Sequence, residues 1–337
     1  MSSDVERIDA PVTHTHIGGQ AVLEGVMMRG KLNWAIAVRK PDGSIHTEEH
    51  ELVSAAKKHE WMRKPIIRGV VALVETMSLA MKAFSISAEM SGETEEEQLT
   101  SKEITMSLVF GAGLAILLFI VLPAVLTNLL VQSSAAEKPF TWNIVDGVLR
   151  VAAFFLYIWG ISRIQDIQRV FAYHGAEHKV IHAYEHGLPL ETKLIQKYST
   201  QHMRCGTSFL LMVMLIAILV FSLVPVRAIA AGLGLEGRWG VMLVAIASRL
   251  ILLPLVAGLA YEVTVKWAGN HSDNAFVKAM LWPGMQLQRM TTREPEDDMI
   301  EVAVAAVLPV IEREKREEGC GEEEPCIEPL ADVPAPA

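Results

Sequence analysis

The densest group of residues that could perform chemistry is the stretch 173–179. His174 and His178 are four residues apart, so on a helix they share one face, where both imidazoles can bind one metal ion. Glu177 lies on nearly the same face. His-x-x-Glu-His is also the inverted zincin signature, in which the glutamate is the general base for a water molecule that zinc activates. The stretch predicts a divalent metal site, with zinc as the metal and Glu177 as base or ligand.

Further metal-capable side chains follow along the chain. The same predicted helix continues with His182, Glu185 and His186, and a second cluster, with His202 and Cys205, precedes an apolar segment. Zinc accepts histidine, cysteine and carboxylate ligands together. We therefore expect the third ligand to be His202, Cys205 or Glu185. A structural zinc closed by four such ligands is the alternative to a catalytic zinc with one open position.

Apolar segments of membrane-spanning length must position these groups. A helix needs about 20 apolar residues to cross a bilayer. Four stretches meet this length, of which 143–162 is the weakest because Asp146 and Arg150 lie in its first turns. The predicted spans are 104–132, 143–162, 206–226 and 240–261. The sequence thus predicts a mainly α membrane protein with about four transmembrane helices.

The basic residues predict how the spans are oriented. The connection 163–204 carries six lysines and arginines, whereas the loops 133–142 and 227–239 together carry three. By the positive-inside rule the long connection is cytoplasmic, and with four spans both termini are cytoplasmic as well. We therefore expect a multi-pass protein of the inner (plasma) membrane, in contact with lipid. Its histidine-rich loop 163–205 would lie at the cytoplasmic face, and short outer loops would lie near Glu137 and Glu236.

Segments on either side of the membrane domain 104–262 are predicted to be cytoplasmic. Segment 16–103 should form strands at 20–28, 34–40 and 44–51, joined in part by a Pro-Asp-Gly turn at 41–43. Residues 66–90 then predict an amphipathic helix on the membrane or on the bundle, with a fifth span as the alternative. Segment 263–312 should contain an amphipathic helix at 298–311, and the ends 1–15 and 313–337 are predicted to be disordered.

A charged residue interrupts the last predicted span. Arg249 lies in the middle of 240–261, where an arginine is costly unless it is paired or faces a polar cavity. Asp146 and Glu262 are candidate partners, and Asp146 could also pair with Arg150 one turn away. We favour a structural intramembrane ion pair over a role in transport.

Glycines cluster around Glu24, at positions 18, 19, 25 and 30. A glycine-rich stretch could cradle a phosphate, but the Gly-Lys-Ser/Thr of a P-loop does not follow. We therefore interpret these glycines as turns and bulges in a small sheet.

The composition narrows the class of protein further. The 337 residues are 20% charged, yet the mean hydropathy is +0.30, so the apolar residues are concentrated in the spans. A net charge of −9 argues against a nucleic-acid partner. Three cysteines do not form a disulfide framework, and Cys320 and Cys326 lie in the acidic tail. We expect a second copy of the chain (a homo-oligomer) or another membrane protein as a partner.

Several longer motifs resemble a known family. They are GGQAVLEGVMMRG at 18–30, RG at 68–69, YHGAEHK at 173–179, HMRCGTS at 202–208, YE at 261–262 and PGMQLQRMTTREP at 283–295. Over about residues 17–308 the chain resembles the bacterial YqhQ-like family, membrane proteins of unknown function that are predicted to be metal-dependent enzymes. The resemblance implies a metal and a site at the cytoplasmic face, but no substrate. Met203 departs from the proline expected there.

The sequence is therefore compatible with three functions. The first is a membrane-embedded zinc hydrolase at the cytoplasmic surface. The second is a transporter or channel built on Arg249 and the histidines, although the uncharged span 104–132 offers almost no polar lining for a route. The third is a non-enzymatic membrane scaffold in which zinc is structural and the hairpin segment and acidic tail bind partners.

Overall fold

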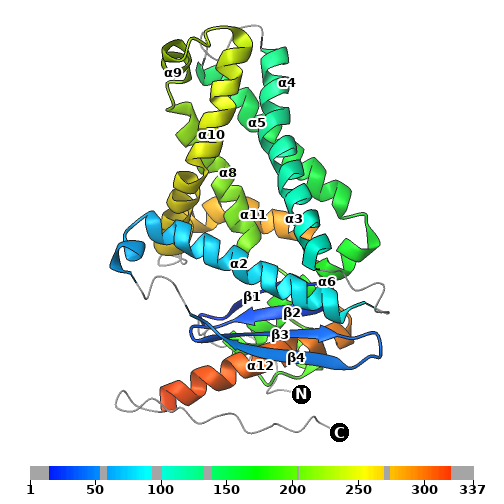
Figure 1. Ribbon diagram of the computed structural model, residues 1–337. Helices are drawn as coiled ribbons and strands as arrows, with labels where there is room; N and C mark the ends of the chain where they lie inside the picture. The colour runs from blue at the N-terminus through cyan, green and yellow to red at the C-terminus, as the bar shows by residue number, and fades with distance from the viewer. Residues whose placement is uncertain are drawn as a thin grey trace.

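The computed structural model describes residues 15–53, 59–92, 101–131, 139–202, 205–268 and 274–319. Long helices form a bundle at one end of the molecule, and a small sheet lies at the other end (Figure 1). The β-rich part and the bundle are separated by helices that run across the base of the bundle (Figure 1). The predicted class, a mainly helical membrane protein with a small N-terminal sheet, is confirmed.

The sheet of the described residues has four antiparallel strands in sequence order. They are β1 Gly18–Val22, β2 Gly25–Arg29, β3 Asn33–Arg39 and β4 Ile45–Glu51. The prediction of one strand over 20–28 was wrong, because the chain reverses there and Val22 pairs with Gly25. Glu24 takes a positive φ of 49° in this tight turn. The later turn holds Gly43 at φ 86°, a conformation that glycine adopts readily.

Helices cover both faces of the sheet. On one face Val26, Met28 and the small Ala35 and Ala37 pack against α6, Gln165–Glu185, and α12, Asp297–Gly319. On the other face Trp34, Ile36 and Val38 pack against α2, Ile67–Met90. Because successive side chains point to opposite faces, β3 supplies both cores. The middle of β3 is therefore apolar on both of its faces.

In the described residues, four helical segments run along the length of the bundle. The first runs through α3 Ser101–Ile116, the π-helical turn η3 Leu117–Val121 and α4 Leu122–Leu130. The others are α5 Pro139–Ile161, the pair α8 Gly206–Ser222 with α9 Val226–Gly232, and α10 Arg238–Tyr261 continued by η4 Glu262–Ala268. Large apolar side chains such as Phe110 and Ile251, 72% and 76% exposed, are placed as expected for lipid contact.

Length and composition alone select a slightly different set of spans. In the described residues, Ile67–Met90, Thr105–Leu130, Thr141–Ile161 and Arg238–Ala268 qualify, and α8 with α9 makes a fifth if the bent pair is counted as one span. The predicted span 206–226 is not one straight helix. It bends by 56° after Ser222, where Pro225 caps the start of α9. Proline has no backbone N–H and cannot continue the preceding helix.

The helix α2 qualifies as a span by composition but runs across the base of the bundle, between the bundle and the sheet (Figure 1). Leu79 and Ala83 pack on the sheet, while Val74 and Met77 are apolar and exposed. Gly69 lies so close to Gly258 of α10 that a Cβ would be 3.0 Å from its Cα. The helix predicted over 66–90 is therefore present and packs on the sheet, while its length and composition also fit a span.

The remaining helices complete the base. They are η2 Glu60–Arg63, α7 Thr192–Ile195 and α11 Ala275–Thr291, of which α11 also lies across the bundle (Figure 1). The helix predicted over 298–311 begins near that position but continues to Gly319, so the predicted disorder from 313 was wrong for its first residues. The predictions for 1–14, for Glu137 and for the tail beyond 319, with Cys320 and Cys326, lie outside the described residues.

Candidate metal centre

The helix α6 presents the candidate ligands beneath the bundle, packed against the sheet and α12. Gly175 lets a neighbouring segment approach its backbone, since a Cβ there would lie 2.0 Å from the carbonyl oxygen of Arg293. The amide of Arg293 in turn donates to the carbonyl of Phe171. The segment that follows α11 is thereby held directly against the histidine-bearing turn of α6.

Three potential ligand atoms converge at this place. His174 and His178 of α6 and Cys205, at the N-cap of α8, each offer one atom, and these atoms lie within 4.8 Å of one another. The Nε2 of His174 is 3.2 Å from the Cys205 sulfur. Tetrahedral zinc, with bonds of about 2.0–2.3 Å, separates such ligand atoms by roughly 3.3–3.6 Å. The spacing suits a zinc-sized ion after small side-chain movements.

Backbone carbonyls orient both imidazoles. The Nδ1 of His174 lies 2.8 Å from the carbonyl oxygen of Thr291, and the Nδ1 of His178 lies 2.6 Å from that of Thr200. A carbonyl only accepts, so each Nδ1 carries the proton and each Nε2 keeps its lone pair. Metal-binding histidines characteristically donate their other ring nitrogen in this manner.

Burial also favours a neutral imidazole at His178 and a protonated thiol at Cys205. It lowers the pKa of His178 well below its ordinary value, with the neighbouring His174 acting in the same direction. Burial raises the pKa of the Cys205 thiol, partly opposed by hydrogen bonds with Thr207. A metal ion would reverse the second effect, because a coordinated cysteine binds as thiolate and releases its proton.

Glu177 is buried beside the three candidate ligands. Burial raises its pKa to about 7, while His174 lowers it and Cys205 raises it. The backbone of Gly19 provides a hydrogen bond to the carboxyl group. Its Oε2 is buried and has no hydrogen-bond partner among the described residues. A buried carboxyl oxygen without a partner is unfavourable, which indicates that a further group belongs at this position.

The other two predicted ligands lie in a neighbouring cluster. His202 Nε2 is 3.4 Å from a carboxylate oxygen of Glu185, and the His202 ring packs against His182 at 4.6 Å between centroids. His182 donates from Nε2 to the carbonyl of Gln201, 2.8 Å away. His202 and Glu185 are therefore not brought into the group of three, whereas Cys205 is. Met203 lies outside the described residues.

The charged residues predicted within the bundle do meet. Arg249 contacts both carboxylate oxygens of Asp146, at 3.0 and 2.9 Å, and Arg150 reaches the same carboxylate at 3.1 Å. The second candidate partner of Arg249, Glu262, instead forms an ion pair with Arg68 of α2. The intramembrane ion pair is thus with Asp146 and not with Glu262.

Glu24 links the sheet to α6. Its carboxylate accepts two hydrogen bonds from Arg169, at 2.6 and 2.5 Å, and the Tyr173 hydroxyl lies 3.4 Å away. The glycines around it allow close packing, since a Cβ on Gly25 would lie 2.4 Å from the carbonyl oxygen of Ala37. The stretch was interpreted as turns and bulges in a small sheet. The turn at Glu24 agrees with the structure, whereas the β1–β2 and β2–β3 pairings contain no bulge.

Four positions were missed by reasoning from side-chain chemistry. Thr200 and Thr291 contribute only backbone carbonyls, and Gly19 and Gly175 act through close approach and backbone hydrogen bonding. A carbonyl is common to all residues, so no sequence signal could identify the first two. Both glycines lie inside the motifs at 18–30 and 173–179, which was the available signal.

Comparison with known proteins agrees with the resemblance found in the motifs. A family model described as "Protein of unknown function (DUF1385)" matches residues 64–313. The "Uncharacterized protein YqhQ" of Bacillus subtilis (strain 168) is 33% identical over 299 residues, covering 85% of this chain and 89% of that protein. No solved structure matches significantly. These descriptions state no metal and no activity, so the expected metal-dependent activity finds no support in them. The chain belongs to the DUF1385 family of proteins of unknown function.

Proposed function

We propose that this membrane protein binds one zinc ion through His174, His178 and Cys205 and acts as a hydrolase at the membrane surface. The observation that carries the proposal is the convergence of three ligand atoms within 4.8 Å beside a buried carboxyl group. Imidazole and thiolate ligands together favour zinc over the hard cations magnesium and calcium. Three protein ligands are the usual number for a catalytic zinc, which keeps its fourth position open.

The side chain of Glu177 supports hydrolysis over a purely structural role. Zinc with an open position supplies Lewis-acid activation of a water molecule. Glu177, three residues from His174 and adjacent to His178, is the group that would accept a proton there. Its buried Oε2 without a described partner matches an oxygen reserved for such a proton. His202 would have to leave the vicinity of Glu185 to close the site as a fourth ligand.

The position of the site suggests where its substrate comes from. The helix α6 packs on the face of the sheet opposite α2, at the sheet end of the molecule (Figure 1). A substrate would reach a site at the sheet end of the molecule from the aqueous phase and not from within the bilayer. The excess of lysine and arginine in 163–204 supports the cytoplasm as that aqueous phase.

Metal analysis of the purified full chain tests the proposal. We expect about one zinc per chain by inductively coupled plasma mass spectrometry, and loss of most of it when His174→Ala and His178→Ala are combined. His186→Ala is the matched control, because His186 caps the end of the same helix but bonds the carbonyl of His182. Wild-type protein without metal after purification in the absence of chelators, or equal loss in the control, would overturn the proposal.

A further inference from the structure

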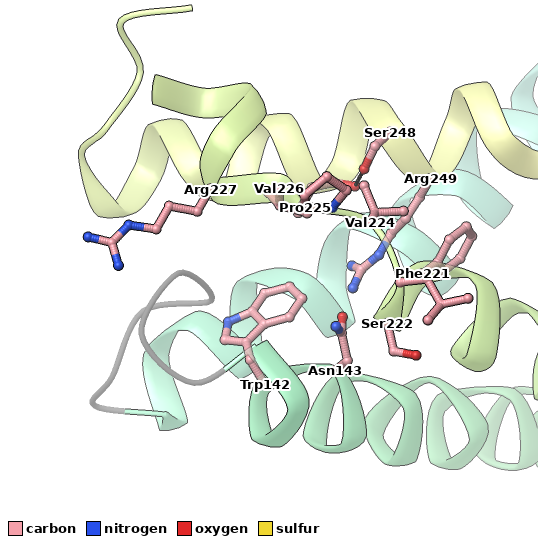
Figure 2. A pocket seen from close by; sticks show the side chains of 12 residues that line it. Trp142, Asn143, Phe221, Ser222, Val224, Pro225, Val226, Arg227, Ser248 and Arg249 are labelled. Carbon is pink, nitrogen blue, oxygen red and sulfur yellow. Dashed lines mark hydrogen bonds between the residues drawn. The ribbon is translucent and has the colours of Figure 1, made fainter. Parts of the chain in front are cut away.

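A pocket of about 230 Å³ lies within the bundle, away from the metal centre. Its walls come from the start of α5, the break between α8 and α9, and the middle of α10 (Figure 2). Figure 2 shows the guanidinium of Arg249 and the amide of Asn143 pointing into the space between these helices. Arg227 also borders the pocket, but its side chain points away from it (Figure 2).

The charge at the pocket is unbalanced. Arg249 is only 2% exposed, and it shares the single carboxylate of Asp146 with Arg150. Among the described residues, this buried cluster therefore pairs two guanidinium groups with one carboxylate. A surplus positive charge inside a membrane domain is unfavourable without a counter-charge. An anion in the pocket would supply it.

Aromatic side chains in the walls hold the arginine in place. The guanidinium of Arg249 lies 4.9 Å from the ring centre of Trp142 and 5.6 Å from that of Phe221. In Figure 2 the Trp142 Nε1 points away from Arg249 and Asn143, so the indole faces the arginine with its ring. Two N–H groups of Arg249 point to the Asp146 carboxylate, and the others of the five guanidinium donors can bind a carboxylate or phosphate oxygen.

The helix break adds an independent argument. Between Ser222 and Val226 the chain leaves helical geometry inside the bundle, and this segment lines the pocket. Irregular backbone at membrane depth is tolerated where it lines a cavity, and discontinuous helices mark binding sites in membrane proteins. The rim at the break is apolar, and Leu223 is 83% exposed.

We propose that this pocket binds an oxyanion, a phosphate or carboxylate group, with Arg249 as its principal partner. The volume lies below the roughly 300–1,000 Å³ of ordinary small-molecule sites, so it admits a head group rather than a whole lipid. The apolar rim beside Leu223 suits the hydrocarbon part of an amphipathic molecule. The anion is therefore either a lipid head group or a free ion, and the test distinguishes the two.

The test measures anion binding by the full chain. One arm uses native mass spectrometry of protein released from phosphatidylcholine nanodiscs that contain phosphatidylglycerol, and the other uses equilibrium dialysis with inorganic phosphate. We expect one retained anionic lipid or one bound phosphate, and about tenfold weaker binding in Arg249→Gln, which leaves Asp146 paired with Arg150. Arg227→Gln, which removes the same charge at the rim, should bind as wild type does.

A second variant covers the case in which Arg249→Gln does not fold. Asn143→Phe narrows the pocket and leaves the arginine–aspartate cluster intact, so it should weaken binding to a similar degree. Retention of lipid assigns the site to a head group, and binding of phosphate alone assigns it to a free ion. The proposal is overturned if wild type binds neither, or if Arg227→Gln loses binding as Arg249→Gln does. Zinc content should not change in any of these variants.

Discussion

The histidine side chains at and near the metal centre differ in the hydrogen-bond partners that orient them. His174 and His178 are each oriented by a carbonyl from another segment, whereas His186 bonds to its own helix. Glu177 is buried against Gly19 of the sheet, where a Cβ would lie 3.2 Å from the carboxyl carbon. The candidate ligands are thus fixed by contacts that arise from distant parts of the chain.

At this scale, Glu177→Gln separates a catalytic from a structural zinc. The amide is nearly isosteric, so we expect zinc content and melting temperature to stay within error while the cellular function is lost. The measurement is complementation of a deletion strain together with metal analysis. Full complementation by Glu177→Gln would point to the structural alternative.

Cys205→Ser, unlike Glu177→Gln, should reduce zinc binding. Replacing a thiolate ligand by a hydroxyl weakens zinc binding, and we expect about tenfold or more weaker zinc retention against a competing chelator. Thr207→Ser is the matched control, because it changes a neighbour of the sulfur but keeps the hydroxyl that bonds it. Undiminished zinc affinity in Cys205→Ser would remove Cys205 from the ligand set.

Whole elements come together through small residues. Gly175 admits the backbone at Arg293, and Gly69 admits α10 against α2. Arg68 of α2 then pairs with Glu262 at the end of α10. These contacts hold α2 against α10, and α6 against the segment that follows α11. The candidate ligands meet at this base of the bundle.

Gly175→Ala tests this dependence. The added Cβ would lie 2.0 Å from the carbonyl oxygen of Arg293, so the segment carrying Thr291 must move. Overpacking of this kind costs about 1–3 kcal/mol. We expect a lower melting temperature and reduced zinc occupancy. Gly160→Ala in α5, where the Cβ meets nothing within 4 Å, is the matched control and should be neutral or stabilising.

In the whole molecule, the sheet near the start of the described chain and α12 at its end lie on the same side of the bundle (Figure 1). Four helical segments run along the bundle between the sheet and α12, and α2 lies across the base. Because four is an even number of passes, the described chain ends on the side on which it began. The arrangement supports the same orientation for the sheet, the metal centre and α12.

The topology is tested by labelling single cysteines in cells. With native cysteines replaced by serine, Glu236→Cys in the loop before α10 should react with a membrane-impermeant maleimide applied outside. Asp42→Cys in the β3–β4 turn should react only after the cells are opened, since it lies at the sheet end. External labelling of the position at 42 would place the sheet and the metal centre outside.

The sequence alone determined which segments are apolar enough to span a membrane and which residues could bind a metal. Spacing of four residues put His174 and His178 on one helix face, because helix geometry is local. Composition also predicted the charged group in the bundle, since Arg249 required a partner and Asp146 was one of two candidates.

Only the tertiary structure decided which residues far apart in the sequence come into contact. It selected Cys205 over His202 and Glu185 for the group of three, because loop paths and not spacing fix which ends meet. It turned α2 across the bundle, although its composition equally fits a span, because the sheet covers one of its faces. Backbone carbonyls and close-packed glycines, which carry no side-chain signal, completed the site.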